Sequence, residues 1–341
     1  MPTYAYVSNA DDGEIATYLL TEAGNLVPRG KAKAGASLGP LALSPDRRRL
    51  YAAVRAKPFS VHVFVVDPAT GALQPHSVSP LAESLPYLSL DRTGRTLLGA
   101  SYGANLVSVN DVDADGRVAS EPRQVIPVGR HAHAIVVDPA NRWAYVPCLG
   151  TDQIVPLRLE AGTLGPAKPV QMQAGTGPRH LVFSSDGRRL YVLGELTGSV
   201  TTFAVNDGVL SELASAGIAT TLRPGAPRSP DAPPRERDND VWAADVHLTP
   251  DNRFLYVSER TRSTIGGFRV EREGRLEWLA ATPTEKQPRG FAIDPQGEFL
   301  IVAGEKSTML SVHAIDDDGS LSPARRFPGG RGGNWVEIVA F

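Results

Sequence analysis

Three stretches of the sequence repeat one pattern, an apolar strand, a polar turn and a second strand. They read LSPDRRRLY at 43–51, FSSDGRRLY at 183–191 and LTPDNRFLY at 248–256. Ser or Thr followed by Pro, Asp, Asn or Gly between two apolar runs is typical of a tight turn joining antiparallel strands. The tyrosine that closes each copy is a fixed point on which the rest of the chain can be aligned.

The alignment extends this pattern over the whole chain of 341 residues. The aligned position is occupied by Tyr6, Tyr51, Leu98, Tyr145, Tyr191, Tyr256 and Ile301. Its intervals are 45, 47, 47, 46, 65 and 45 residues. A period of about 40–50 residues with several short strands per repeat is typical of a propeller. The sequence therefore predicts an all-β fold, a seven-bladed β-propeller that forms a single domain over residues 1–341.

Two features of this repeat are irregular. The long interval contains LRPGAPRSPDAPPRERDND at 222–240, which is rich in Pro and charge and has no strand pattern. We expect a surface loop inserted between blades, either as a lid over a ligand site or as decoration. The first copy lacks its first strand, because only five residues precede Tyr6. We therefore expect NWVEIVAF at 334–341 to complete the first blade beside residues 4–8, which removes an open edge.

Composition narrows the class of partner. The formal net charge of −2 gives no reason to expect nucleic acid or an anionic membrane as a partner. No apolar run approaches the roughly 18–20 residues that span a bilayer, and no secretory signal pattern precedes the first strand. The lone Cys148 cannot form an internal disulfide, which suits a reducing compartment. We expect a cytoplasmic monomer.

Two columns of the repeat collect charged residues that packing does not require. Twelve positions before the fixed point stand Gly39, Pro86, His133, Arg179, Ala244, Arg289 and, from the closing strand, Asn334. Four positions after the fixed point stand Ala10, Arg55, Tyr102, Leu149, Glu195, Arg260 and Glu305. The columns begin one strand and end its antiparallel neighbour, so they lie at the same end of each blade. We expect their side chains to converge at one mouth of the central channel.

The residue types in these columns predict a chemistry. The columns contain four arginines, Arg55, Arg179, Arg260 and Arg289. Guanidinium groups bind carboxylate or phosphate with paired hydrogen bonds, so together they predict an anion pocket. Glu195 and His133 are the titratable pair that could move protons. A structural interpretation, in which Glu195 only holds an arginine in place, stays open.

The histidines of the sequence do not form a recognisable set of metal ligands. His131 and His133 are alternate residues, so on a strand they would share one face, as two zinc ligands could. A metal site needs three or four ligands, however, and the remaining histidines are scattered in the sequence. We expect no metal and no cofactor. Asp245 and His247 also share one strand face, and we expect a hydrogen-bonded pair with a structural role.

Five stretches of the chain resemble signature segments of the bacterial propeller-type 6-phosphogluconolactonases. They are GPRH at 177–180, GEL at 194–196, WAADVH at 242–247, QPRGF at 287–291 and AGEKS at 303–307. The resemblance runs from Tyr4 to the end of the chain. The same superfamily includes the fungal 3-carboxy-cis,cis-muconate lactonizing enzymes, whose catalytic histidine, two arginines and glutamate are matched by His133, Arg179, Arg289 and Glu195. Two departures are notable: His131 offers a second histidine, and Glu305 stands where the bacterial stretch often has glutamine.

The resemblance implies hydrolysis of a sugar lactone, with 6-phosphogluconolactone of the pentose phosphate pathway as the default substrate. Glu195 or His133 would be the general base and the other would return the proton, while Arg179 or Arg289 would stabilise the oxyanion. The implied substrate-binding residues are Arg55, Tyr102, His131, His180, Arg260, Glu305 and Lys306.

Three other functions remain open. The same arginines would suit a lactonase for an unphosphorylated or dicarboxylic sugar lactone, or a muconate-type cycloisomerase. A protein-binding scaffold is the non-enzymatic alternative, since a fold does not determine function. The chain lacks the recurring Trp-Asp and Gly-His pairs of WD-type scaffolds.

Overall fold

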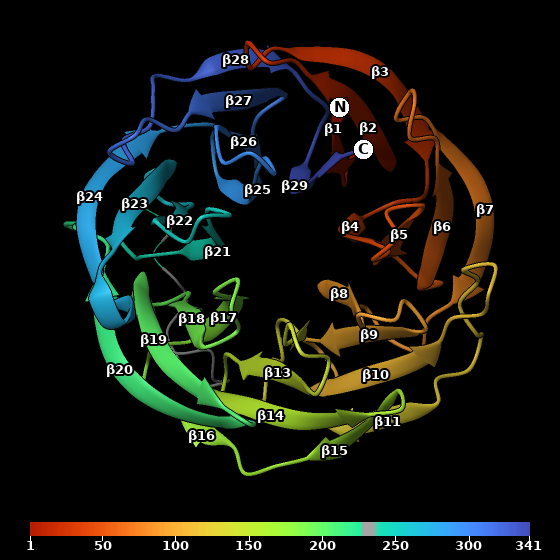
Figure 1. The fold of residues 1–341 in the computed structure, drawn as a ribbon, viewed down its shortest axis with the longest axis horizontal. Helices are drawn as coiled ribbons and strands as arrows, with labels where there is room; N and C mark the ends of the chain where they lie inside the picture. Colours follow the sequence, from red (N-terminus) through yellow and green to blue (C-terminus); the bar gives the residue numbers. More distant parts are fainter. Residues whose placement is uncertain (227–235, 237) are drawn as a thin grey trace.

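Seven antiparallel sheets are arranged in a ring around a central axis in the computed structural model, which describes residues 1–226, 236 and 238–341. Figure 1 shows the sheets as blades in chain order around the ring, with both termini side by side in the first blade. The predicted seven-bladed propeller is confirmed. Of the predicted insertion, residues 227–235 and 237 lie outside the described residues, and Arg223 pairs with Asp240 across its base at 3.1 Å.

The strands of each blade follow one another from the channel outward. Blade 1 contains β29 (Gly333–Ala340), β1 (Thr3–Asn9), β2 (Glu14–Leu20) and β3 (Leu26–Lys33). Blade 2 contains β4 (Leu38–Leu43), β5 (Arg49–Val54), β6 (Ser60–Val66) and β7 (Leu73–Pro80). Blade 3 contains β8 (Tyr87–Leu90), β9 (Thr96–Ser101), β10 (Leu106–Asp111) and β11 (Gln124–Pro127). Blade 4 contains β12 (Val136–Val137), β13 (Trp143–Cys148), β14 (Gln153–Glu160) and β15 (Thr163–Pro166), with β16 (Val170–Gln171) also paired to β14.

The remaining blades follow the same order. Blade 5 contains β17 (Pro178–Phe183), β18 (Arg189–Gly194), β19 (Ser199–Asn206) and β20 (Val209–Gly217). Blade 6 contains β21 (Ala243–Leu248), β22 (Phe254–Glu259), β23 (Thr264–Val270) and β24 (Leu276–Pro283). Blade 7 contains β25 (Pro288–Ile293), β26 (Phe299–Gly304), β27 (Met309–Ala314) and β28 (Arg325–Pro328). One short 3-10 turn at Arg272–Gly274 is the helical element of the described chain, and no described helix has the length and apolarity to cross a membrane.

The hydrophobic core lies between neighbouring blades. One cluster, for example, joins Leu98 and Val107 of blade 3 to Ala144 and Val146 of blade 4, all fully buried. A blade has two faces and cannot cover both by itself, so each blade depends on the next for burial.

The tyrosine that marks the repeat has a specific role in this packing. Its ring is buried on the second strand of the blade, and in three blades its hydroxyl bonds to the next blade. Tyrosine hydroxyls donate hydrogen bonds from Tyr6 to Gly71 O, from Tyr51 to Gly116 O and from Tyr256 to Gly319 O, at 3.0, 3.0 and 2.9 Å. At these three positions the repeated residue joins adjacent blades by both packing and hydrogen bonding. The hydroxyl of Tyr145 has no hydrogen-bond partner among the described residues, so that tyrosine contributes by packing.

The ring is closed by the last strand of the chain. β29 pairs antiparallel with β1, with Ala340 opposite Thr3 and Val336 opposite Val7. This register confirms that the C-terminal segment supplies the missing strand of blade 1. The two ends of the chain therefore complete one sheet, and β29 contributes residues to the channel.

Candidate active site

A left-handed turn sets the position of the channel residues in several blades. In five blades a residue with positive φ lies two positions before the column that contains His133, Arg179 and Arg289. These residues are Ser37, His131, Gly177, Gln287 and Gly332. The carbonyl of this turn residue accepts a backbone N–H from the residue of the other column, the one that contains Glu195 and Glu305. Glu195 donates to Gly177 O at 2.8 Å, and Glu305 donates to Gln287 O at 3.0 Å. The two columns therefore meet at one mouth of the channel, as the repeat alignment predicted.

This turn also settles the alignment of the two histidines. His131 has φ of 58° and its carbonyl accepts the backbone N–H of Leu149, so it occupies the turn position that Gly177 has in blade 5. His133 is then the structural equivalent of Arg179 and Arg289. His131 is half-buried and its ring stacks on Tyr102 at a centroid distance of 4.2 Å.

Glu195 joins two buried arginines from adjacent blades. Its Oε2 lies 3.0 Å from Nε of Arg179 and 3.0 Å from Nη2 of Arg260, and each of the three side chains is at most 6% exposed. Both guanidinium groups also donate to backbone carbonyls: Arg179 Nη1 donates to Ala244 O, and Arg260 donates to Trp242 O and Ala243 O. The Arg260 guanidinium also lies 3.7 Å from the ring centroid of Trp242. Glu195, Arg179 and Arg260 thus form a hydrogen-bonded layer at the base of the mouth, called the floor below.

Burial and like charges act on these arginines in the same direction. Burial, reinforced by the charges of Arg260 and Arg289, lowers the pKa of Arg179 to about 9. Burial lowers the pKa of Arg260 to about 10, against the favourable charge of Glu195. Both groups remain cationic at neutral pH, so the floor has two positive charges against one glutamate.

Arg289, Glu305 and Arg55 form the more open part of the mouth. Arg289 Nη1 lies 3.0 Å from Glu305 Oε1, and the two side chains are 21% and 20% exposed. Burial and the charge of Arg289 lower the pKa of Arg55 to about 10, so the two guanidinium groups lie close enough to repel. Arg55 donates to Ser84 Oγ at 3.3 Å and forms no ion pair within the described chain. Its charge is available to an anion.

His133 lies among these cations as a buried, neutral imidazole. It is 6% exposed, and burial together with Arg179, His180, Arg289 and Arg260 holds its pKa well below the ordinary value. Its ring contacts those of Tyr102 at 5.8 Å and His180 at 5.2 Å. A neutral imidazole beside a cationic pocket can accept a proton from a bound nucleophile.

A second layer of side chains lines the channel one residue further along the inner strands. It contains Tyr87, His180, Asp245 and Trp335, and residues of this layer also line a pocket of about 520 Å³ together with His247 and Glu337. The predicted pair of Asp245 and His247 is confirmed, with Nε2 of the histidine 3.2 Å from Oδ2. His180 and Asp245 were singled out separately from the sequence, but they were not recognised as one column, which follows that of His133 and Arg179 in the repeat alignment.

The predicted site residues lie together at this mouth, with two exceptions. Lys306 follows Glu305 in the chain, but its side chain is exposed. His180 lies one layer deeper than predicted for a substrate contact. Within the described residues, no three His, Cys, Asp or Glu side chains are grouped to hold a metal ion.

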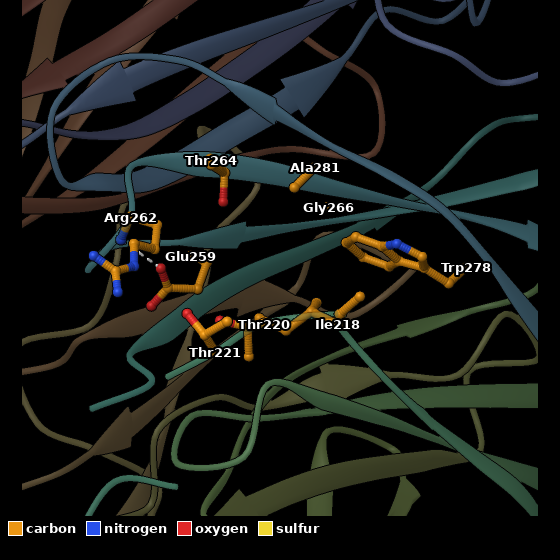
Figure 2. Close-up of a pocket in the computed structure, with 10 residues that line it drawn as sticks. Ile218, Thr220, Thr221, Glu259, Arg262, Thr264, Gly266, Trp278 and Ala281 are labelled. Carbon is orange, nitrogen blue, oxygen red and sulfur yellow. Dashed lines mark hydrogen bonds between the residues drawn. The ribbon is translucent and has the colours of Figure 1, made fainter. Parts of the chain in front are cut away.

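A second pocket, of about 510 Å³, lies between blades 5 and 6. Figure 2 shows its wall of Ile218, Trp278 and Ala281 beside Glu259, whose carboxylate accepts the backbone N–H of Arg262 at 2.6 Å. None of the predicted site residues lines this pocket. Its lining is mostly apolar and lacks the cluster of cations found in the channel.

Known proteins resemble this chain along its whole length. Residues 4–338 match the family model described as lactonase, 7-bladed beta-propeller. The chain is 36% identical to a 6-phosphogluconolactonase of Serratia proteamaculans over all of both chains. It is 37% identical to a 6-phosphogluconolactonase of Pectobacterium carotovorum, covering all of this chain and 99% of the relative. The solved structure of the periplasmic gluconolactonase of Pseudomonas aeruginosa superimposes with a TM-score of 0.88 at 29% identity, covering 100% of this chain and 99% of the other. The chain therefore belongs to the seven-bladed β-propeller lactonase family.

Proposed function

We propose that this protein hydrolyses a phosphorylated sugar lactone, 6-phosphogluconolactone, at the mouth formed by His133 and the four arginines. The observation that carries the proposal is the charge of that mouth. Four arginine charges face two glutamate charges, which leaves a surplus of two positive charges around a neutral imidazole. A phosphorylated lactone supplies the matching negative charge, and ring opening adds a carboxylate to it.

His133 is the general base in this proposal. Glu195 is a poor candidate, because an ion pair with Arg179 and Arg260 stabilises its ionised form and disfavours the uptake of a proton. His133 removes a proton from water as the water oxygen attacks the lactone carbonyl carbon. The tetrahedral intermediate then breaks its bond to the ring oxygen, which receives the proton from His133. The carboxylic acid so formed ionises and releases one proton.

Arg289 is the arginine available to stabilise the oxyanion. Arg179 is 1% exposed and donates to Glu195 and to the carbonyl of Ala244, so it acts by fixing Glu195 and by its field. Arg289 is 21% exposed and has one nitrogen on Glu305, which leaves donors for the substrate. One such donor contributes about 3 kcal/mol to stabilisation of the transition state. Arg55 binds the phosphate.

A pair of substrates tests this assignment. The relatives are named for both 6-phosphogluconolactone and gluconolactone, so the phosphate is the point of difference. We expect a higher kcat/KM for 6-phosphogluconolactone than for gluconolactone, and we expect Arg55→Ala to abolish most of that preference. Equal kcat/KM values in the wild type would assign the protein to an unphosphorylated lactone. Turnover of a carboxymuconate without turnover of either lactone would assign it to cycloisomerisation.

We also propose that the protein acts as a cytoplasmic monomer without a metal. The support is that arginines supply the positive charge that a metal would otherwise provide, and that Cys148 is a buried, unpaired thiol. Burial raises the pKa of this thiol to about 12, so it is unreactive. Activity that survives dialysis against EDTA, at the elution volume of a 36.4 kDa monomer, is the expected outcome.

A further inference from the structure

His180 lies at the centre of the channel, directly beneath the proposed base. It is 4% exposed, and its ring contacts rings from three other blades. The centroid distances are 5.2 Å to His133, 5.2 Å to Tyr87 and 5.9 Å to Trp335. Its hydrogen-bond partner, Asp245, comes from a fourth blade. A side chain reached from four other blades lies near the channel axis.

Asp245 is held as a carboxylate by four donors. Its Oδ1 lies 2.7 Å from His180 Nδ1 and accepts the backbone N–H of Val246 at 3.0 Å. Its Oδ2 lies 3.2 Å from His247 Nε2 and accepts the backbone N–H of Phe291 at 3.4 Å. Burial alone would raise the pKa of Asp245, but the charges and hydrogen bonds of His247 and His180 hold it well below the ordinary value.

An ionised carboxylate can only accept hydrogen bonds, which fixes the tautomer of His180. The imidazole must carry its proton on Nδ1, and Nε2 is then the bare acceptor. Burial and the charge of Arg179 lower the pKa of His180 to about 4, so the ring is neutral at physiological pH. Among the described residues, His180 Nε2 has no hydrogen-bond partner.

His133 has a matching unsatisfied atom. Its Nδ1 is buried and has no hydrogen-bond partner in the described part of the chain. The His133 and His180 rings are in contact. His180 Nε2 is a free acceptor, and His133 Nδ1 must act as a donor once His133 has taken up a proton. The charged groups facing His133 are otherwise cations: Arg179, Arg260 and Arg289. Tyr102 and Tyr87 are the phenols beside His133 and His180, and Glu337 lies beyond His247.

We propose that Asp245 and His180 are positioning residues that hold His133 from the channel side and stabilise its protonated form. When His133 takes up a proton, its Nδ1–H donates to His180 Nε2, a hydrogen bond that is absent from the present structure. His180 Nδ1–H donates to Asp245, whose negative charge offsets the surrounding arginines. The proton taken from water stays on His133 until it passes to the ring oxygen, and neither Asp245 nor His180 changes its protonation state. The role rests on the proposed function, and it extends the role of Asp245 beyond the structural pair with His247.

The test compares Asp245→Asn, His180→Gln and the double variant with Asp138→Asn in the full-length protein. Asp138 is also buried, at 7% exposure, and accepts backbone N–H bonds in a turn of blade 4, so it controls for loss of a buried carboxylate. We expect the first two changes to lower kcat on 6-phosphogluconolactone by about 10²–10⁴-fold. KM should change by less than about threefold, because neither residue touches the substrate. The double variant should be no slower than the slower single variant, since the residues act as one unit.

Two further readouts separate positioning from folding. The acid limb of kcat/KM should move to lower pH in Asp245→Asn, because removal of the negative charge makes His133 harder to protonate. Histidine ¹⁵N spectra, with the His180 signal assigned from its loss in His180→Gln, should show the Nδ1–H tautomer in the wild type and its loss in Asp245→Asn.

The outcomes are distinguishable. Folded Asp245→Asn and His180→Gln with kcat within about threefold of the wild type would overturn the proposal, as would an Nε2–H tautomer in the wild type. If Asp245→Asn fails to fold, His180→Gln and the wild-type spectrum decide. A wild type without activity on any lactone would refute the proposed function, and the tautomer measurement would still test the pairing of Asp245 with His180.

Discussion

The Nη2 atom of Arg260 lies 3.0 Å from Oε2 of Glu195, although the two residues are 65 positions apart and belong to neighbouring blades. The same oxygen lies 3.0 Å from Arg179 of blade 5. The floor of the proposed active site is thus assembled only when blades 5 and 6 pack together. The packing of blade 5 against blade 6 therefore both contributes to the ring and brings the charged residues of the site together.

Replacement of Glu195 by glutamine should be costly for stability. It leaves two buried guanidinium groups adjacent without their carboxylate, and breaking a buried ion pair by removing one partner costs about 3–5 kcal/mol. Glu305→Gln is the matched control, because its pair with Arg289 is partly exposed and such pairs contribute less than about 1 kcal/mol. Urea denaturation of both variants measures the difference. Equal losses would show that the Glu195 network is not the anchor of the site.

The pH dependence of kcat/KM should report a base with a lowered pKa. Burial and four cationic or histidine neighbours hold the pKa of His133 well below 6.5, so the imidazole stays neutral and competent as the pH falls through 6.5. After subtraction of spontaneous hydrolysis, activity should be flat between about pH 6.5 and 7.5, with its acid limb below the ordinary histidine pKa. A limb centred at or above 6.5 would rule out this buried imidazole as the base.

Glu337→Gln should stabilise the protein at alkaline pH. Burial raises the pKa of Glu337 to about 7, although Trp335 Nε1 donates to its Oε1 at 2.8 Å. The unfolded chain ionises this carboxyl at lower pH than the folded chain does. Between the two pKa values the folded state therefore binds more protons, and stability falls as the pH rises through about 7.

Thermal melting at two pH values measures this effect. The gain in Tm of Glu337→Gln over the wild type should be larger at pH 8 than at pH 5, by at least about 2 °C. A gain that is the same at both pH values would mean that Glu337 ionises as an exposed carboxyl does.

Deletion of residues 334–341 should prevent formation of a stable ring. β29 forms the inner strand of blade 1, and Val336 and Val339 are buried in the cores on its two sides. Without it, β1 has an open edge and blades 1, 2 and 7 lose apolar contacts. A soluble truncation product with a cooperative melting transition, measured by circular dichroism, would contradict this account of closure.

Much of the fold could be predicted because its determinants are local and repeated. The turns at 44–47 and 249–252 and the tyrosines beside them recur at one interval, and the C-terminal strand was identified by a missing copy at the other end. The charged columns were also readable, since antiparallel pairing alone places them at one end of each blade.

Side-chain contacts between blades could not be predicted from the sequence in the same way. The bonds of Glu195 to Arg260 and of His180 to Asp245 depend on how far one blade is rotated against the next, which no local pattern encodes. The choice between His131 and His133 required the backbone, because a positive φ at His131 identifies it as the turn residue. The exposed position of Lys306 likewise depends on the conformation of a turn.

The central claim is that the arginine-lined mouth catalyses lactone hydrolysis, and Arg289→Ala tests it most directly. Hydrolysis of 6-phosphogluconolactone is measured with EDTA present and corrected for the spontaneous rate. The control is Arg158→Ala, which removes an arginine from an exposed ion pair with Glu160. We predict rapid turnover by the wild type and the control, and a loss of about 10²-fold in kcat for Arg289→Ala. Full activity in a folded Arg289→Ala variant would contradict the account and place the reaction elsewhere on the propeller.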